Sequence, residues 1–145
     1  MITNEREYRI TRAEAEKFER ALRLTQEQGA DVHPRIHQAI REGAESLLCD
    51  LREQLSAYEA LRGGRIRVLE LDSLREIPDA LIRARIAAGL TQRALAERLR
   101  LKEQQIQRYE ATRYAGVSLE RIQSVADALG VQIHERLLLP APTTE

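Results

Sequence analysis

The chain has 145 residues, of which 43% are hydrophobic, 32% are charged and only 3% are aromatic. Leu, Ile and Val recur with a clear period, so this composition excludes disorder throughout and predicts one or two small domains with a real core. The 23 basic and 23 acidic residues cancel, so net charge alone does not indicate a nucleic-acid partner.

The sequence predicts a cytoplasmic protein. No uninterrupted apolar run approaches the roughly 18 residues of a membrane span. The start, MITNEREYRI, is charged where a secretory signal would be apolar. Cys49 is the only cysteine, which excludes an internal disulfide and fits a reducing compartment. We therefore expect no membrane partner.

Residues 1–64 predict an N-terminal helical hairpin that serves oligomerisation or partner binding. The stretch Thr-Arg-Ala-Glu at 11–14 is a capping-box pattern. It precedes a helix that should end at Gly29. Pro34 opens a second, longer helix that runs to the glycine pair at 63–64. Apolar residues of this second helix alternate at spacings of three and four, close to a coiled-coil seam.

The two predicted helices differ in length. At about 1.5 Å per residue, residues 12–28 span about 25 Å and residues 34–62 span about 43 Å. The far end of the longer helix therefore carries an apolar overhang, which we interpret as an oligomer or partner surface. Its cover could come from the second domain, from residues 1–10, from a second copy of the chain or from a different protein. The overhang consists of Leu51, Leu55, Tyr58 and Leu61.

The sequence after the hairpin divides into three parts. Residues 65–72 are predicted to form a connector, residues 73–138 a second domain and residues 139–145 a disordered tail. Two stretches rich in branched side chains, 65–71 and 131–137, predict one or two short strands. These strands could pair with each other within a chain or across a dimer.

Residues 73–130 predict an all-α arrangement of four short helices. This stretch holds 10 basic and 7 acidic residues, whereas residues 1–72 hold 12 and 14. Thr91 and Ser118 stand at N-cap positions, and the small Ala96 falls where two helices would cross. Two of the helices have only about two turns and a three-residue turn joins them, which is typical of a helix-turn-helix. The expected helices are 78–88, 92–99, 103–110 and 119–129.

A series of residues at fixed offsets runs through the predicted helix-turn-helix. It comprises Leu90, Thr91, Gln92, Leu95, Ala96, Leu99, Ile106, Arg108, Glu110, Leu119, Ala126, Leu129, Gly130 and Val131. Through this series, residues 81–131 resemble the lambda-repressor-like (Xre) helix-turn-helix family. The sequences of 81–92 and 104–110 are also similar to those of HigA-type antitoxins. Two positions depart from the family pattern. Arg100 replaces the usual turn glycine and Lys102 the usual Ser or Thr cap, so we expect the turn to take a slightly different path.

The resemblance implies that the helix 103–110 lies in the major groove of DNA, where its outward side chains meet base edges. Glutamine and arginine match adenine and guanine edges, and glutamate accepts from cytosine. The expected base-reading residues are Glu103, Gln104, Gln107 and Arg108. The expected phosphate contacts are Gln92, Lys102 and Arg113. The resemblance also implies a structural ion pair between Arg85 and Glu110 that fixes the orientation of the reading helix.

These observations predict a sequence-specific DNA-binding transcriptional regulator. It would be an autoregulatory repressor and, within the HigA-type resemblance, the antitoxin of a type II toxin–antitoxin pair. The expected partners are a palindromic double-stranded operator, a second copy in a homodimer and a cognate toxin. The alternative is a helical protein-interaction module whose helix-turn-helix fold no longer binds DNA. We expect no enzymatic activity, no cofactor and no metal site, because the sequence has no phosphate loop, nucleophile elbow or zinc pattern.

Overall fold

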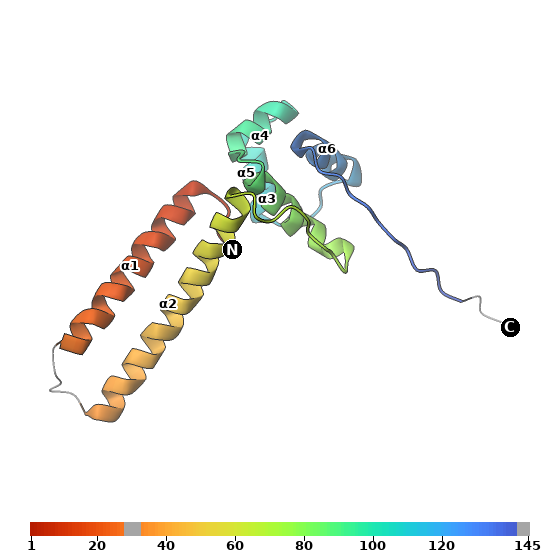
Figure 1. Ribbon diagram of the computed structural model, residues 1–145. Helices are drawn as coiled ribbons and strands as arrows, with labels where there is room; N and C mark the ends of the chain where they lie inside the picture. The colour runs from red at the N-terminus through yellow and green to blue at the C-terminus, as the bar shows by residue number, and fades with distance from the viewer. Residues whose placement is uncertain (28–32, 142–145) are drawn as a thin grey trace.

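The computed structural model describes residues 1–27 and 33–141, and in these ranges it is all-helical, as the sequence predicts (Figure 1). A long helical hairpin comes first and a group of shorter helices follows it. None of the helices described is long and apolar enough to cross a membrane. In chain order the elements are α1 (Glu5–Glu27), α2 (Pro34–Arg62), the 3-10 helix η1 (Leu74–Glu76), α3 (Ile77–Ala87), α4 (Gln92–Leu99), α5 (Glu103–Ala111) and α6 (Leu119–Leu129).

The hairpin of α1 and α2 projects away from the shorter helices (Figure 1). Helix α1 begins well before the predicted cap at Thr11, which lies inside the helix. The side chain of Asn4 accepts from the backbone N–H of Glu7 at 2.9 Å, and the Glu7 carboxylate accepts from the N–H of Thr3 at 2.7 Å. This reciprocal capping satisfies the N–H of Glu7 in the first turn and that of Thr3 before it. The predicted helix end at Gly29 lies outside the described residues.

The early start of α1 changes the interpretation of the overhang. The ring of Tyr8 stacks on that of Tyr58, with centroids 5.1 Å apart. Ile2 joins Tyr58 and Leu61 in the core cluster that connects the hairpin to the shorter helices. Tyr58 and Leu61 are therefore interior side chains, which corrects their assignment to a partner surface. The cover comes from residues 1–10 and from the second domain, because α1 is long enough to reach them.

The first part of the overhang is also largely covered. Leu55 packs partly buried against the same core cluster, and Leu51 is half-buried. Three other apolar side chains of α2 remain open to solvent at spacings of four and seven, which puts them on one face of the helix. We call them the α2 apolar stripe. It consists of Ile36, Ile40 and Leu47, which are 56%, 61% and 51% exposed.

The shorter helices α3 to α6 enclose their own core. Four large apolar side chains, one from each helix, are fully buried there. They are Ile82, Leu95, Ile106 and Val125. Ala96 is 1% exposed at the packing of α4 on α5, where a larger side chain would separate the two helices. The four predicted helices are confirmed to within one or two residues at their ends.

The two stretches predicted as strands do not form a sheet. Residues 65–71 and 131–137 have no strand hydrogen bonds, since a strand needs a neighbour and the C-terminal stretch extends away from the helices (Figure 1). The predicted tail begins at Leu139, and residues 139–141 have no regular structure. Its remaining residues, 142–145, lie outside the described part of the chain.

Candidate nucleic-acid interface

The turn between α4 and α5 keeps a tight path. Thr91 caps α4 by accepting from the N–H of Ala94 at 3.0 Å. Arg100 takes the left-handed conformation, with φ 56° and ψ 39°, and the N–H of Leu101 donates to the carbonyl of Ala96 at 2.9 Å. This is the hydrogen bond that closes a helix C-terminus when the preceding residue, usually a glycine, is left-handed. The backbone of the turn therefore does not change its path as expected. Arg100 instead adopts the left-handed conformation, which is unfavourable for a residue with a side chain.

The cap of α5 is the other departure from the family pattern. Lys102 has the extended backbone of an N-cap residue, but its side chain offers no acceptor to the helix. The side-chain oxygen of Gln105 accepts from the N–H of Lys102 at 3.2 Å and supplies half of a capping box. The ammonium group of Lys102 is exposed at the start of α5.

Helix α5 divides sharply into an inner and an outer face. Ile106 is fully buried and Glu110 is 4% exposed. The four predicted base-reading residues are all exposed on the opposite side of the helix. They are Glu103, Gln104, Gln107 and Arg108. The amide of Gln107 donates to the carboxylate of Glu103 at 3.2 Å, so these two side chains hold each other along the outer face.

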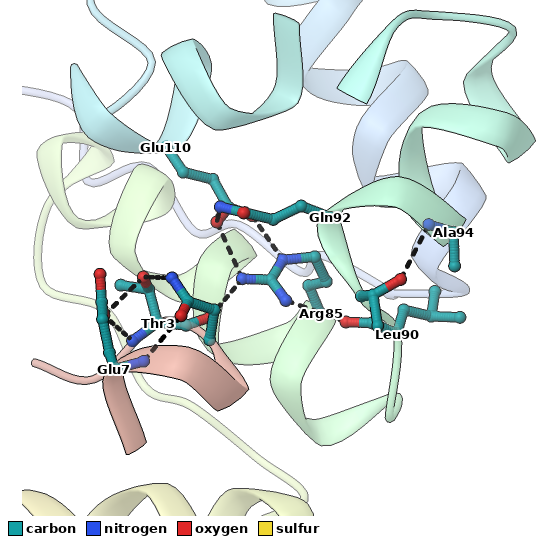
Figure 2. Close-up of polar contacts among 9 residues, drawn as sticks. Thr3, Glu7, Arg85, Leu90, Gln92, Ala94 and Glu110 are labelled. Carbon is teal, nitrogen blue, oxygen red and sulfur yellow. Dashed lines mark hydrogen bonds and ion pairs between the residues drawn. The ribbon is translucent and has the colours of Figure 1, made fainter. Parts of the chain in front are cut away.

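The inner face of α5 is fixed by the buried pair of Arg85 and Glu110 (Figure 2). The guanidinium of Arg85, from α3, donates to the two carboxylate oxygens of Glu110 at 2.5 and 2.8 Å. Its other N–H groups donate to the carbonyls of Leu90 at 2.9 Å and Thr3 at 2.5 Å. Such a bidentate arrangement, in which four of the five guanidinium N–H groups donate, resists rotation of α5. The pair therefore orients the outer face.

Gln92 also contacts the pair. Its amide donates to a carboxylate oxygen of Glu110 at 2.7 Å (Figure 2). The first residue of α4 and the last turn of α5 thus share one carboxylate, which links the two helices of the motif. Gln92 is half-buried and still reaches the surface.

Two of the predicted phosphate contacts lie at the ends of α5. Lys102 stands at the start of α5, and Arg113 follows its end. Arg113 has a left-handed backbone with φ 52° and forms an ion pair with Asp79 of α3. Both cations are exposed, so they flank the outer face of α5 from its two ends.

The turn after α5 is supported by two tyrosines. The rings of Tyr109 and Tyr114 lie 5.8 Å apart and tilted by 36°. Tyr114 is 4% exposed, and its burial, together with the nearby Glu110 carboxylate, raises the pKa of its phenol above the usual value. The hydroxyl therefore stays protonated at neutral pH. This aromatic pair packs the base of the turn that presents Arg113.

The site also contains a part that the sequence analysis did not identify. Residues 3–7 lie against the helix-turn-helix and line one wall of a groove whose other wall is formed by α4 and α5. We call it the N-terminal groove. The pattern Asn4-x-x-Glu7 is a capping signal that could have placed the start of α1 correctly. The bond from Arg85 to the Thr3 carbonyl carries no sequence signal, because any residue has a backbone carbonyl.

The comparisons with known proteins agree with this geometry. A family model described as Helix-turn-helix matches residues 81–136. The comparison with curated proteins gave no match, and neither did the comparison with solved structures. The matched range contains α4, the turn and α5, and it leaves out the hairpin. Residues 81–136 are therefore similar to a helix-turn-helix family, which agrees with the resemblance to Xre, or lambda-repressor-like, proteins.

Proposed function

We propose that this protein is a sequence-specific DNA-binding regulator that represses transcription and controls its own operon. The observation that carries the proposal is the exposed row of side chains on α5, whose orientation is fixed by the buried pair of Arg85 and Glu110. Helix-turn-helix families of this kind are DNA-binding regulators, and the proposal includes no catalysed reaction.

The chemistry of the outer face suits the major groove. Gln104 has the amide donor and acceptor that pair with the N6 and N7 edge of adenine, and Arg108 has the guanidinium fork that pairs with guanine O6 and N7. Glu103 can accept from a cytosine amino group, or it can keep Gln107 in place through their mutual hydrogen bond. A helix that presents four such groups on one face can read successive base pairs.

The phosphate contacts position this row. Gln92, at the first turn of α4, is expected to donate to a phosphate, and so are Lys102 and Arg113 at the two ends of α5. These contacts carry no sequence information but fix the register of α5 on the duplex. Arg113 would contact the phosphate from its present position, in which its guanidinium pairs with Asp79.

The regulator is proposed to act as a dimer on a palindromic operator. Two copies on half-sites about one helical turn apart gain affinity that a single mildly basic domain lacks. Because Tyr58 and Leu61 are interior, we assign the dimer contact to the α2 apolar stripe and commit it to a second copy of this chain. A second hairpin laid against the stripe would form a four-helix arrangement.

A toxin partner is the finer part of the proposal. Leucines 137–139, at the end of the extended C-terminal stretch, are 78% to 89% exposed. An unpaired apolar stretch of this kind favours pairing with another protein. If the protein is an antitoxin, this stretch is where we expect the toxin to bind. The same exposure favours the alternative function, a protein-interaction module that does not bind DNA.

Binding measurements on four single variants test the DNA proposal. Gln104→Ala and Arg108→Ala should each lose about 1–3 kcal/mol on the operator and little on scrambled duplex, because they remove base contacts. Lys102→Ala and Arg113→Ala should weaken both duplexes alike and lower the salt slope by about one unit each. The measurement is a titration of both duplexes across a salt series, with the operator taken from the region upstream of the gene.

Two results would overturn this assignment. If Gln104→Ala and Arg108→Ala leave the ratio of operator to scrambled affinity unchanged, α5 is not the reading helix. If the unchanged protein shows no operator preference at any salt concentration, the interaction-module alternative replaces the regulator. Arg41→Ala is the matched control, since Arg41 is exposed and pairs with Glu45 on α2, outside the helix-turn-helix.

A further inference from the structure

The N-terminal groove joins two parts of the molecule that are far apart in sequence. One wall is the first turn of α1, residues 3–7, and the other is formed by the residues that we expect to meet DNA, among them Gln92, Gln107 and Arg113. The groove has a volume of about 890 Å³. The hairpin is outside the family match, so the family resemblance assigns nothing to this wall.

Three of the four arginines that line the groove pair with carboxylates, whereas Glu7 and Glu103 line it without an ion pair in the described residues. Arg62 pairs with Glu5, and Glu7 accepts from the backbone and hydroxyl of Thr3. Arg113 is held by an aspartate of α3, and the buried arginine of α3 by the last turn of α5. Among the cations that line the groove, Arg6 is the one that has no ion pair within the described residues.

The position of Arg6 is fixed by its neighbours on both sides. Before it, the carbonyl of Thr3 accepts from Arg85 at 2.5 Å, and Asn4 caps the helix (Figure 2). After it, Tyr8 stacks on Tyr58 and donates its hydroxyl to a carboxylate of α2 at 2.7 Å. Arg6 therefore stands on a helical turn that is tied both to α2 and to the helix-turn-helix.

We propose that Arg6 contacts the DNA phosphate backbone and extends the interface beyond the helix-turn-helix. This inference rests on the proposed function. Arg6 and Gln92 both line the groove. A DNA phosphate bound by Gln92 at the first turn of α4 would therefore lie at the opening that Arg6 also faces. The unpaired guanidinium offers a forked donor to its oxygens. The hairpin then also takes part in DNA binding, because it places a cation beside the DNA strand that α4 contacts.

The test is Arg6→Gln, compared with Arg9→Gln as the matched control. Both arginines are exposed on α1, but Arg9 does not line the groove. Arg6→Gln should lower the salt slope by about 0.9 and weaken binding roughly eightfold at 0.1 M salt, equally on operator and scrambled duplex, because one phosphate contact releases about one counterion. Arg9→Gln should behave as the unchanged protein. Thermal melts of both variants should coincide with that of the unchanged protein.

The outcomes separate this inference from the proposed function. If Gln104→Ala loses operator preference while Arg6→Gln binds like Arg9→Gln, the regulator stands and the Arg6 contact is wrong. A gain in affinity for Arg6→Gln also overturns it, since the first turn of α1 would then repel DNA. If the unchanged protein binds neither duplex, the proposed function and this inference both fail.

Discussion

The hairpin and the helix-turn-helix region are stabilised in different ways. Fully buried apolar side chains from α3, α4, α5 and α6 meet in one core, and the one buried ion pair of the described residues lies beside it. Among the described residues of the hairpin away from the junction, only Ala15 and Leu48 are buried, and the ion pairs are exposed. Exposed ion pairs each add little to stability. The hairpin thus depends on its junction and on the proposed second copy.

This difference indicates how the two regions divide their work. A reading helix must hold its angle, so its orientation depends on charge-assisted bonds that have little freedom. The proposed dimer contact needs open apolar surface, and α2 exposes Ile36, Ile40 and Leu47. The Thr3 carbonyl is where the two regions share one arginine.

The largest effect is expected from breaking the buried pair. Arg85→Met and Glu110→Gln should each destabilise the protein by about 3–5 kcal/mol, because each leaves an uncompensated buried charge or unmet donors. The double variant should cost less than the sum of the two. Thermal or urea melts of all three measure it, and Arg52→Gln, which removes an exposed pair with Glu19, is the control at under about 1 kcal/mol.

The two single variants should also differ in where the protein loosens. Arg85→Met removes the bond to Thr3, so amide exchange in the first turn of α1 should speed up. Glu110→Gln leaves that bond in place and should loosen α5 first. Additive losses under 1 kcal/mol would mean that the pair does not orient α5, and the comparison between the regions would lose its main support.

The sequence was sufficient for the helix-turn-helix because its signals are local. Caps at Thr91 and Ser118, glycines at 89 and 130 and an apolar face on each helix give the helix bounds directly. The resemblance to the family predicted that Arg85 pairs with Glu110. Arg100 was the exception, since the sequence shows an unfavourable residue but not that the surrounding turn imposes the left-handed conformation on it.

The hairpin was harder to predict because two capping signals compete there. Both Asn4-x-x-Glu7 and Thr11-x-x-Glu14 fit a helix start, and the structure uses the first, whose helix also brings Tyr8 onto Tyr58. The apolar overhang was predicted because the second signal starts the helix later and makes it too short to cover the end of the longer helix. The N-terminal groove could not be predicted, because it depends on a backbone carbonyl and on how two regions dock.

A smaller effect is expected from charging the α2 apolar stripe. The double variant Ile40→Glu with Leu47→Glu should raise the dimer dissociation constant at least about 100-fold, since each large apolar side chain contributes on the order of 1.5–3 kcal/mol when fully buried. Helix content should not change, because both positions are exposed in one copy. Sedimentation over a concentration series measures the change in mass.

The control for the dimer test lies in the other region. Leu119 is 74% exposed at the start of α6, away from the hairpin, so Leu119→Glu should leave the mass unchanged. A chain that is monomeric at all concentrations before mutation, or a double variant that keeps the mass of the dimer, would contradict the assignment of the stripe. The hairpin would then be stabilised by its junction alone.

The smallest effect concerns the hydroxyl of Tyr114, which is buried and meets no hydrogen-bond partner in the residues that the structure describes. Tyr114→Phe should be neutral or stabilise the protein by up to about 1 kcal/mol, since it removes a desolvated polar group.

The raised pKa of Tyr114 gives the sign of the pH effect. A phenol that is harder to ionise when folded contributes stability that is complete below about pH 10 and is lost as the pH rises above it. Urea melts between pH 7 and 11 should therefore show a growing advantage for Tyr114→Phe, and a variant that is less stable at pH 7 would mean that the hydroxyl has a partner.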